Sequence, residues 1–331
     1  MTGGARDRRD PYQPFREQLL PPARVRELSQ LRPGRVVFDV AVSWLIILGS
    51  WWFAAFHTTW WSVGIAMVVI GTQYYALFII GHDGLHRRLF PRREQNDLFC
   101  DLFVFAAIGA ITRLNNRNHL GHHQHLATEN DPDRYKHACF NKSNLAELLG
   151  YLSGLATIWT SVRNVFFADG RAPRGEARDD GYTLRDVALL GGVQLVLMAG
   201  LTYVFGWWGW PLLWAIPVYV FTYLGDSIRS FAEHSHPQAD ALADEHRLIS
   251  YVSSPLEAMF LAPKNMNFHA AHHLWVSIPY YNLPIADAEM RAHPLASRLE
   301  WRRSYVTYLV RYALALPLED CRVSARAASP V

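Results

Sequence analysis

The sequence predicts an all-α membrane protein, with four transmembrane helices in two hairpins and a cytosolic helical cap that carries a histidine-rich dimetal site. Two observations predict this fold class. No Lys or Arg occurs between Arg35 and Arg87 or between Arg185 and Arg229, and each interval has room for two helices of about 20 apolar residues. Three histidine-rich motifs lie at the end of the first interval or outside both. The intervals predict the spans, and the motifs predict the site.

The N-terminal arm and the first hairpin come first along the chain. Residues 1–35 are polar, contain five prolines and predict a cytosolic arm. Residues 36–56 and 60–80 are apolar and predict two spans, which only residues 57–59 separate. So short a connection requires an antiparallel hairpin. Its tip carries four tryptophans, whose amphipathic rings favour the headgroup region of a membrane.

The middle of the chain precedes the second hairpin. Residues 98–111 are too short to cross a bilayer and predict a re-entrant or interfacial segment, and residues 144–167 predict a helix in the interface. Residues 187–205 and 210–228 predict the second pair of spans, again with tryptophans and no positive charge at the tip. Residues 291–331 then form a cytosolic or interfacial tail.

The distribution of positive charge predicts the orientation. In this arrangement all 32 Lys and Arg residues lie on one side of the membrane, which the positive-inside rule makes the cytosolic side. The three histidine motifs fall on the same side. We therefore expect a multi-pass protein integral to the cytoplasmic membrane, with the site and both termini on the cytosolic side.

The histidine motifs have the spacing of metal ligands on helices. Residues one turn apart share a helical face, so each motif presents at least two imidazoles together. The motifs contain eight histidines, namely His82, His86, His119, His122, His123, His269, His272 and His273. Eight ligands are too many for one ion, so two metals are expected. Imidazole suits iron, copper, nickel and zinc alike.

Other residues near the motifs are candidates for supporting roles. His234 ends the fourth span and is expected to be a ninth ligand, whereas His125 and His236 are expected in support or on the surface. Ligating imidazoles usually donate their second N–H to a carboxylate or a carbonyl. The acidic residues placed for this are Asp83, Glu233, Asp131 and Asp133, of which the last two could equally serve a turn around Pro132. Asp226, inside a span, is costly there and often functional.

The neutral ligand set favours redox chemistry. Imidazoles leave the charge of two metals uncompensated except by water, hydroxide or oxygen species, which suits a pair that activates O2 and removes hydrogen from an unactivated C–H bond. Hydrolytic zinc pairs usually include bridging carboxylates, and no motif has one at a ligand position. Iron is therefore favoured.

Taken together, the motifs His-x-x-x-His, His-x-x-His-His and His-x-x-His-His resemble those of the membrane fatty acid desaturase family. Two segments are similar to its bacterial branch: Asn118 to His123 running on to Asp131-Pro132-Asp133, and Asn267 to Trp275 running on to Pro279 to Pro284. The resemblance covers residues 36–290. The first motif, with only three intervening residues, and Ser230, where animal acyl-CoA desaturases carry Asn, depart from that subgroup, so its substrate and regiochemistry do not transfer.

The resemblance implies the cofactors, the substrate and the partners. It implies two non-haem iron ions (Fe2+/Fe3+) held by the nine histidines, O2 as co-substrate, and a long apolar lipid substrate, most simply a fatty acyl chain that is desaturated. It also implies a ferredoxin or small cytochrome with its reductase as electron donor. No His-Pro-Gly-Gly segment of a fused cytochrome occurs, so the donor is expected to be a separate protein.

Two other functions compete with desaturation, and one class of partner is disfavoured. A hydroxylase or ketolase of the same architecture, acting on a carotenoid, an alkane or a specialised metabolite, shares the first hydrogen abstraction and stays open. A metal transporter would need ligands near the bilayer midplane, and here they lie at one face. The net charge of +3 without a basic-aromatic pattern argues against a nucleic-acid partner.

Overall fold

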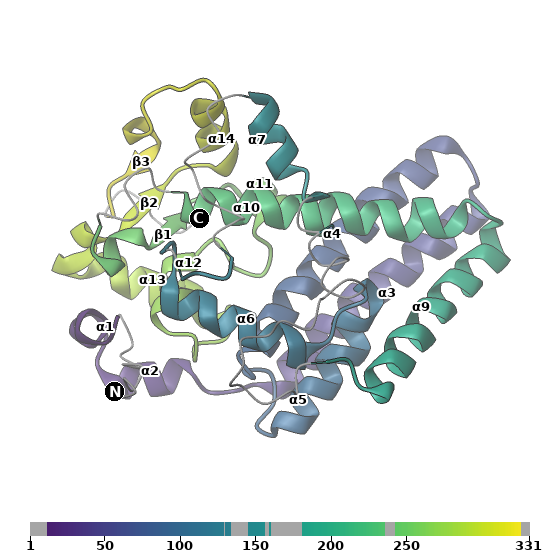
Figure 1. Cartoon of the computed structure of the whole chain (residues 1–331), viewed down its shortest axis with the longest axis horizontal. Helices are drawn as coiled ribbons and strands as arrows, with labels where there is room; N and C mark the ends of the chain where they lie inside the picture. Colours follow the sequence, from purple (N-terminus) through teal and green to yellow (C-terminus); the bar gives the residue numbers. More distant parts are fainter. Residues whose placement is uncertain are drawn as a thin grey trace, which may run out of the picture.

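Helices dominate the fold. The computed structural model describes residues 12–128, 130–133, 145–155, 159, 181–235 and 242–325 (Figure 1). The α-helices are α1 Gln13–Leu19, α2 Pro22–Leu28, α3 Pro33–Phe56, α4 Trp60–Leu85, α5 Arg93–Cys100, α6 Thr112–His125, α7 Leu145–Leu152, α9 Leu184–Phe205, α10 Gly225–His234, α11 Pro255–Leu261, α12 His269–Leu274, α13 Leu283–Ala292 and α14 Tyr305–Ala313. The 3-10 and π turns are η1 Asp101–Phe105, η2 Ala106–Ile108, η4 Pro211–Ala215, η5 Val218–Leu224, η7 Asp244–Arg247, η8 Tyr280–Asn282, η9 Pro294–Arg298 and η10 Glu319–Cys321.

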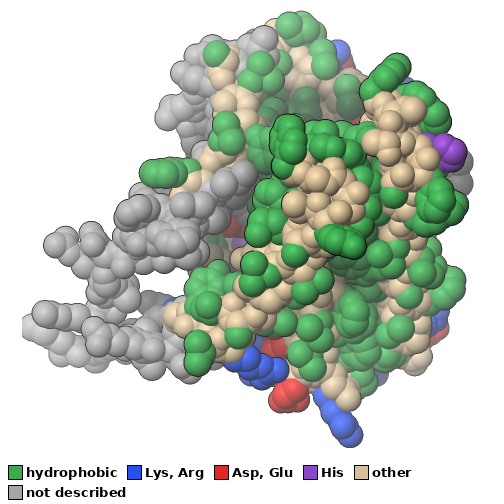
Figure 2. Space-filling view, turned by 90° about the vertical axis from the view of Figure 1, so that its right-hand side faces the viewer, with side chains coloured by type: hydrophobic (Ala, Val, Ile, Leu, Met, Phe, Trp, Pro, Cys, Tyr) green, Lys and Arg blue, Asp and Glu red, His purple; other side chains and the backbone are tan. Residues whose placement is uncertain are grey.

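Three helices in the described part of the chain are long and apolar enough to cross a membrane. They are α3, α4 and α9, and they contain the predicted spans 36–56, 60–80 and 187–205. They gather at the end of the molecule opposite the cap, and hydrophobic side chains cover most of that end (Figures 1 and 2). Capping boxes at Thr59 and Thr183 satisfy backbone N–H groups at the starts of α4 and α9.

The predicted span 210–228 is helical but irregular. Helical conformation runs from residue 209 to residue 234, yet η4 and η5 within it are π-helical. Pro211 begins η4 and Pro217 directly precedes η5. A proline within a helix removes one backbone hydrogen bond, which disturbs the regular α-helical ladder. A π turn rotates the residues that follow it relative to those before it. The stretch therefore presents a different face at each end.

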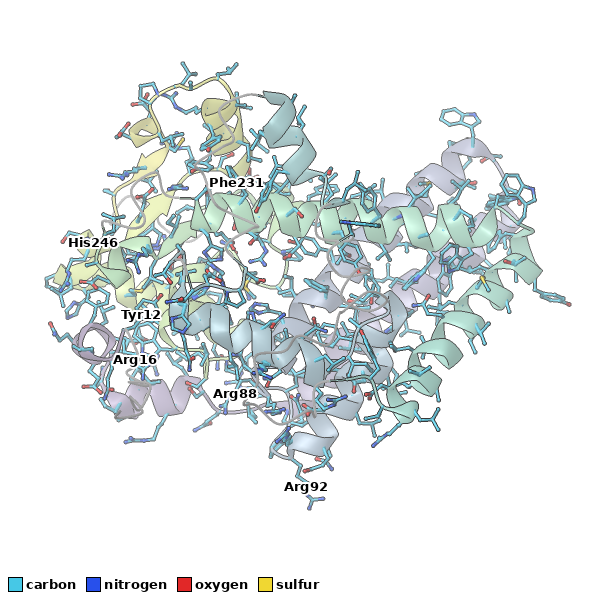
Figure 3. The ribbon with its side chains drawn as sticks, viewed as in Figure 1. Tyr12, Arg16, Arg88, Arg92, Phe231 and His246 are labelled. Carbon is cyan, nitrogen blue, oxygen red and sulfur yellow. The ribbon has the colours of Figure 1, made fainter. Side chains whose placement is uncertain are left out.

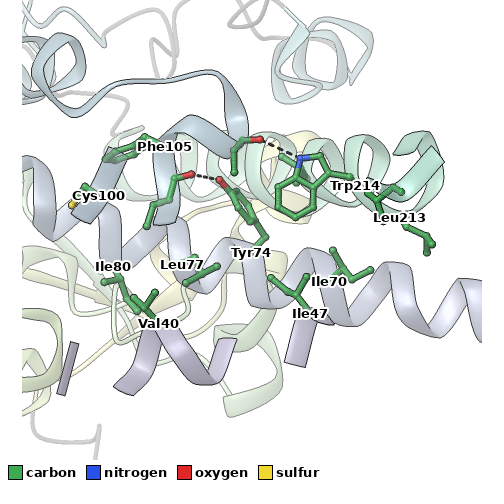
Figure 4. Packing of buried hydrophobic residues seen from close by; sticks show 14 of the residues in the cluster. Val40, Ile47, Ile70, Tyr74, Leu77, Ile80, Cys100, Phe105, Leu213 and Trp214 are labelled. Carbon is green, nitrogen blue, oxygen red and sulfur yellow. Dashed lines mark hydrogen bonds between the residues drawn. The ribbon is translucent and has the colours of Figure 1, made fainter. Parts of the chain in front are cut away.

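Trp214 is the centre of the packing between the long helices. Its ring stacks on Trp44 of α3 with centroids 5.9 Å apart. It also meets the ring of Tyr74 of α4 edge-on at 4.9 Å (Figure 4). Its Nε1 donates to the carbonyl of Ala107 at 3.1 Å, and the Tyr74 hydroxyl donates to the carbonyl of Val104. These bonds hold η1 and η2, which belong to the predicted re-entrant stretch 98–111, against the helices.

The cap differs from the prediction because it contains a β-sheet, so the chain is not wholly α-helical. The strands are β1 Ile249–Tyr251, β2 Glu300–Arg302 and β3 Arg322–Val323. Their order is β1-β2-β3, with β1 parallel to β2 and β2 antiparallel to β3. Strands of two or three residues are too short to show the alternation that identifies a strand in a sequence.

Helices α1 and α2 pack against the cap. Tyr12, Phe15 and Leu19 are buried in one cluster with Trp275 and Met290. Figure 3 labels Tyr12 and Arg16 next to each other at the start of the chain, and Arg16 donates to the carbonyl of Leu274 at 3.3 Å. Much of the predicted N-terminal arm is therefore folded onto the cap, and residues 1–11 lie outside the described part.

Two peripheral helices cover the end of α10. Phe231 of α10 contacts Tyr151 of α7 and Tyr312 of α14, with ring centroids 6.0 and 4.9 Å apart (Figure 3). Helix α7 is the described beginning of the predicted interfacial stretch 144–167, most of which lies outside the described residues. Helix α14 belongs to the predicted tail.

Candidate metal centre

The structure brings all nine predicted histidines into one buried cluster in the cap. His82 and His86 come from the end of α4, and His234 ends α10. The second motif lies on α6 and the third on α12. Neighbouring rings of the cluster are as close as 4.1 Å between centroids, for His123 and His273. Residues from 82 to 273 thus converge on one place.

The end of α4 is fixed by a Schellman turn. The N–H of Arg88 bonds to the carbonyl of Asp83 at 3.1 Å, and that of Arg87 bonds to Gly84 at 3.0 Å. Arg87 has the left-handed conformation that this motif requires, with φ 55°. Arg88 also donates to the carbonyls of Ser277 and Ser29, which ties the turn to the chain after α12 and after α2 (Figure 3). His86 is thereby held as the C-cap residue that directly follows α4.

Helix α6 begins at a carboxylate cap. Both the N–H and the hydroxyl of Thr112 donate to Oδ1 of Asp101, at 2.7 and 2.6 Å. The charge that interrupts the apolar stretch 98–111 therefore starts the helix of the second motif. Asn116 donates to the carbonyl of Leu85, so that α6 is bonded directly to the end of α4.

The small sheet holds the third motif. Ser250 of β1 accepts a hydrogen bond from the N–H of Ala270 at 3.0 Å, and Asn267 pairs with the backbone of Tyr251 in both directions. The Tyr251 hydroxyl and Arg302 of β2 both donate to the carbonyl of Ala232 near the end of α10. The sheet thus positions α12 and His234 together.

The imidazoles fall into two groups, each arranged as the ligands of one ion would be. Position A comprises His82, His86, His119 and His272, and position B comprises His122, His234 and His273; the nearest ring nitrogens within each group lie within 4.8 Å of one another. His123 adjoins position A, with its Nε2 3.2 Å from Nε2 of His119, and His269 adjoins position B, with its Nε2 3.2 Å from Nε2 of His234. At position A the Nε2 atoms of His86 and His119 are 2.8 Å apart. Lone pairs that converge in this way require a cation between them or a proton.

The buried nitrogens are neutral donors. Burial first, and then the neighbouring imidazoles, lower the pKa of His123 and of His273 well below the ordinary value of 6.5. Burial likewise lowers the pKa of His272. The rings are therefore uncharged at neutral pH, which is the form that binds a metal. Both ring nitrogens of His272 and of His273 are buried without a hydrogen-bond partner in the described structure.

Two carboxylates contact the cluster. Oδ1 and Oδ2 of Asp131 lie 3.0 and 3.1 Å from Nδ1 of His122, and Oε2 of Glu233 lies 3.3 Å from Nδ1 of His269. Asp131 also accepts the N–H groups of Ala127 and Asp133 at 2.8 Å each, so it serves the turn as well as the histidine. Both expected roles of Asp131 are therefore present.

Other predicted supporting residues have different contacts. Asp83 accepts the N–H of Tyr280 at 2.6 Å instead of supporting a histidine. Asp226 pairs with Arg229 at 2.7 Å. His125 is exposed at the end of α6. His236 lies outside the described residues.

Sequence reasoning missed the two residues that fix Glu233. Arg229 donates to its Oε2 at 2.6 Å, and the Tyr305 hydroxyl donates to its Oε1 at 2.7 Å. The spacing of Arg229 and Glu233 by four residues in a helix is a signal for the first pair. Tyr305 lies far along the chain, and nothing local in the sequence connects it with Glu233.

The ligand set fits two first-row transition metals. Nitrogen ligands suit iron, copper, nickel and zinc. Glu233 lies within the same reach of His234 and His269, but its two oxygens already accept hydrogen bonds from Arg229 and Tyr305. Buried imidazoles that converge in a cap next to long apolar helices are the arrangement expected of a membrane metalloprotein.

Comparison with known proteins identifies the family. A family model for fatty acid desaturases matches residues 58–305, which is well over half of the chain, and the chain belongs to this family. It is therefore an oxidoreductase enzyme. Its long apolar helices agree with the membrane setting of such enzymes.

The curated relatives are lipid desaturases from cyanobacteria. The chain is 25% identical to an sn-1 oleoyl-lipid 12-desaturase of Anabaena variabilis, over 75% of this chain and 73% of the relative. It is 24% identical to an sn-1 oleoyl-lipid 12-desaturase of Synechocystis sp., over 75% and 74% of the two chains. It is 25% identical to an sn-1 acyl-lipid omega-3 desaturase (ferredoxin) of Nostoc sp., over 70% and 67%.

Proposed function

We propose that this enzyme is an O2-dependent di-iron desaturase that removes hydrogen from an unactivated C–H bond in the fatty acyl chain of a lipid. The observation that carries the proposal is the pair of buried imidazole groups, positions A and B, in a member of the fatty acid desaturase family. The names of the relatives support an acyl chain held in a lipid as the substrate. Regiochemistry is outside this proposal.

The proposed roles of the nine histidines follow from the geometry. His82, His86, His119, His123 and His272 would hold one iron, and His122, His234, His269 and His273 the other. When bound, the iron pair supplies the activation of O2 and the oxidising power for hydrogen abstraction. The chain itself supplies neutral, buried nitrogens and excludes water, because His272 is fully buried and the other rings of its motif nearly so. An acyl chain would have to approach the cluster from the apolar helices.

The same proposal includes the membrane arrangement. Helices α3, α4 and α9 would be three of the spans, and the helical stretch 209–234 would supply the fourth over residues 210–228. The segregation of Lys and Arg then puts the cap and both termini in the cytosol. The charged side chains visible in Figure 2 lie mainly at the lower edge of the apolar end, as expected at such a boundary.

Electrons would come from a separate small redox protein. One relative carries ferredoxin in its name, which supports a donor of this kind. A ferredoxin or a small cytochrome, each with its reductase, delivers single electrons and needs only a surface close to the cap.

The test is lipid mass spectrometry on cells that express the full chain together with a ferredoxin and its reductase. Cells with the wild type should contain an acyl lipid lighter by two hydrogens. Cells that express His272→Ala should lack that lipid, and the variant protein should lack iron, because His272 is a buried member of position A. The matched control is His125→Ala, which removes an exposed histidine from the end of α6 and should keep the product.

Two results would contradict the proposal. Turnover that persists in His272→Ala would remove the dimetal assignment. A product heavier by one oxygen would replace desaturation with hydroxylation or ketone formation in the same architecture.

A further inference from the structure

The two metal positions differ in their contacts with carboxylates. At position B, Nδ1 of His122 faces both oxygens of Asp131 at 3.0 and 3.1 Å, and Nδ1 of His269 faces Glu233 at 3.3 Å. At position A, the Nδ1 atoms of His82, His86 and His272 are buried and make no hydrogen bond within the part of the chain that the structure describes. At B, His122 thus has a hydrogen-bonded carboxylate and His269 has a carboxylate 3.3 Å from its Nδ1, although that contact is not a hydrogen bond. Within the described residues, neither arrangement is present at the three rings of A.

The carboxylates at position B are themselves held in place. Asp131 is nearly buried and accepts two backbone N–H groups, from Ala127 and Asp133. Glu233 is fully buried and accepts Arg229 on one oxygen and Tyr305 on the other. Both acidic groups therefore point at their histidines without needing to be reordered when a metal binds.

A carboxylate behind an imidazole changes the metal that the ring holds. It fixes the tautomer, so that Nδ1 carries the proton and Nε2 keeps its lone pair, and it raises the basicity of that lone pair. Loss of such a partner typically weakens metal binding by about 10- to 100-fold. Position B has one such hydrogen-bonded partner, Asp131 on His122, and a second carboxylate, Glu233, in contact with Nδ1 of His269.

We propose that the two positions are inequivalent, and that Asp131 and Glu233 make position B the tighter one, which a divalent transition metal fills first. Asp131 and Glu233 are thus positioning residues for one ion of the pair and not for the other. The inference rests on the proposed dimetal function, and it adds an order of loading and a difference between the two ions.

The test is an anaerobic titration of the metal-free full chain, in detergent micelles, with ferrous iron alone. Calorimetry measures the affinity of each binding step, and Mössbauer spectroscopy reports the environment of each bound iron. The wild type should bind iron in two steps and show one quadrupole doublet after the first equivalent and two after the second. Asp131→Asn and Glu233→Gln should each weaken the tighter step by about 10- to 100-fold and change only the first doublet. Neither should move the weaker step.

Two further variants separate positioning from general loss of structure. Tyr305→Phe removes one donor to Glu233 and should weaken the tighter step by a smaller factor, with the weaker step unchanged. Asp287→Asn is the matched control, because Asp287 is a buried carboxylate of the cap that pairs with Arg291 and Trp301 and contacts no histidine in the described structure. It should leave both steps unchanged.

The outcomes distinguish this inference from the proposed function. Two equivalents bound in a single step of one affinity, or equal weakening of both steps by Asp131→Asn and Glu233→Gln, would overturn the inequivalence while leaving the dimetal site intact. A wild type that binds no iron would overturn the dimetal site itself, and the inequivalence with it.

Discussion

Replacing Gly84 by alanine should force the end of α4 away from α5. A Cβ atom at Gly84 would lie 2.1 Å from Sγ of Cys100 and 3.3 Å from Cδ1 of Leu89. Ordinary van der Waals contact begins at 3.4 Å, so the sulfur would have to move by more than an ångström. Cys100 is fully buried, so its side chain cannot move aside without displacing its neighbours. Because Asn96 of α5 also donates to the carbonyl of Gly84, the two helices cannot separate without losing that bond.

The expected loss of stability lies at the upper end of the range for overpacking, about 3 kcal/mol. Gly84 is two residues from both His82 and His86, so a shift of this turn should also reduce the iron content of the purified protein. Cys100→Ala alone removes one buried sulfur and should cost on the order of 1 kcal/mol. In the double variant the nearest remaining atom of residue 100 is its Cβ at 3.5 Å, an ordinary contact.

The assay is the thermal unfolding midpoint in detergent micelles together with iron content. Gly84→Ala should be the least stable variant, and the double variant Gly84→Ala/Cys100→Ala should recover much of the loss, since contacting sites do not add. Gly64→Ala is the matched control on α4, because a Cβ there meets nothing within 4 Å. The reasoning fails if Gly84→Ala matches the wild type, or if the double variant is no more stable than Gly84→Ala.

Two further predictions concern the cap. Phe15→Ala should lower the unfolding free energy by about 3–5 kcal/mol, because the Phe15 ring is buried and lies 4.8 Å from the guanidinium of Arg298. Gln18→Ala, which changes an exposed residue of the same helix, should change the unfolding free energy by less than about 0.5 kcal/mol. Similar unfolding midpoints for the two variants would refute the packing of α1. The metal-free protein should lose stability with acid, because the pKa of His273 lies well below 6.5 in the fold and the unfolded chain therefore takes up the proton first. That contribution is complete above about pH 6.5 and is lost as the pH falls through this value towards the folded pKa. The thermal unfolding midpoint of the metal-free protein should therefore be lower at about pH 5.5 than at about pH 7.5. An unchanged or higher midpoint at the lower pH would contradict the burial of neutral rings.

The gathering of the histidines was predictable because their helical spacing can be read from the sequence. Histidines three or four residues apart share a face in α6 and α12 whatever surrounds them. His234 had a weaker signal, its place at the end of a predicted span, and the structure brings it into the cluster 3.2 Å from His269. Its role as a ligand remains a prediction.

The contacts that position the cluster were not predictable in the same way. The strand that holds α12 has three residues, and the hydroxyl that fixes Glu233 belongs to Tyr305. Pairings across such distances leave no periodic trace in a single sequence. The all-α prediction was wrong for the cap for this reason, and the two possible roles of Asp131 could not be separated until the turn around it was seen.

The docking of α1 and α2 has a consequence for the order in which the protein is assembled. These helices are among the first residues to be synthesised, but they are held by late ones: Arg24 pairs with Glu289, and Asn282 donates to the carbonyl of Leu28. The N-terminal segment must therefore remain undocked until the ribosome has passed the third histidine motif. By then all nine histidines of the cluster have been made, so docking of α1 and α2 onto the cap marks a chain in which the histidine cluster can be complete. Contacts of such long sequence separation form slowly, which leaves an interval during synthesis when the cluster is open and incomplete.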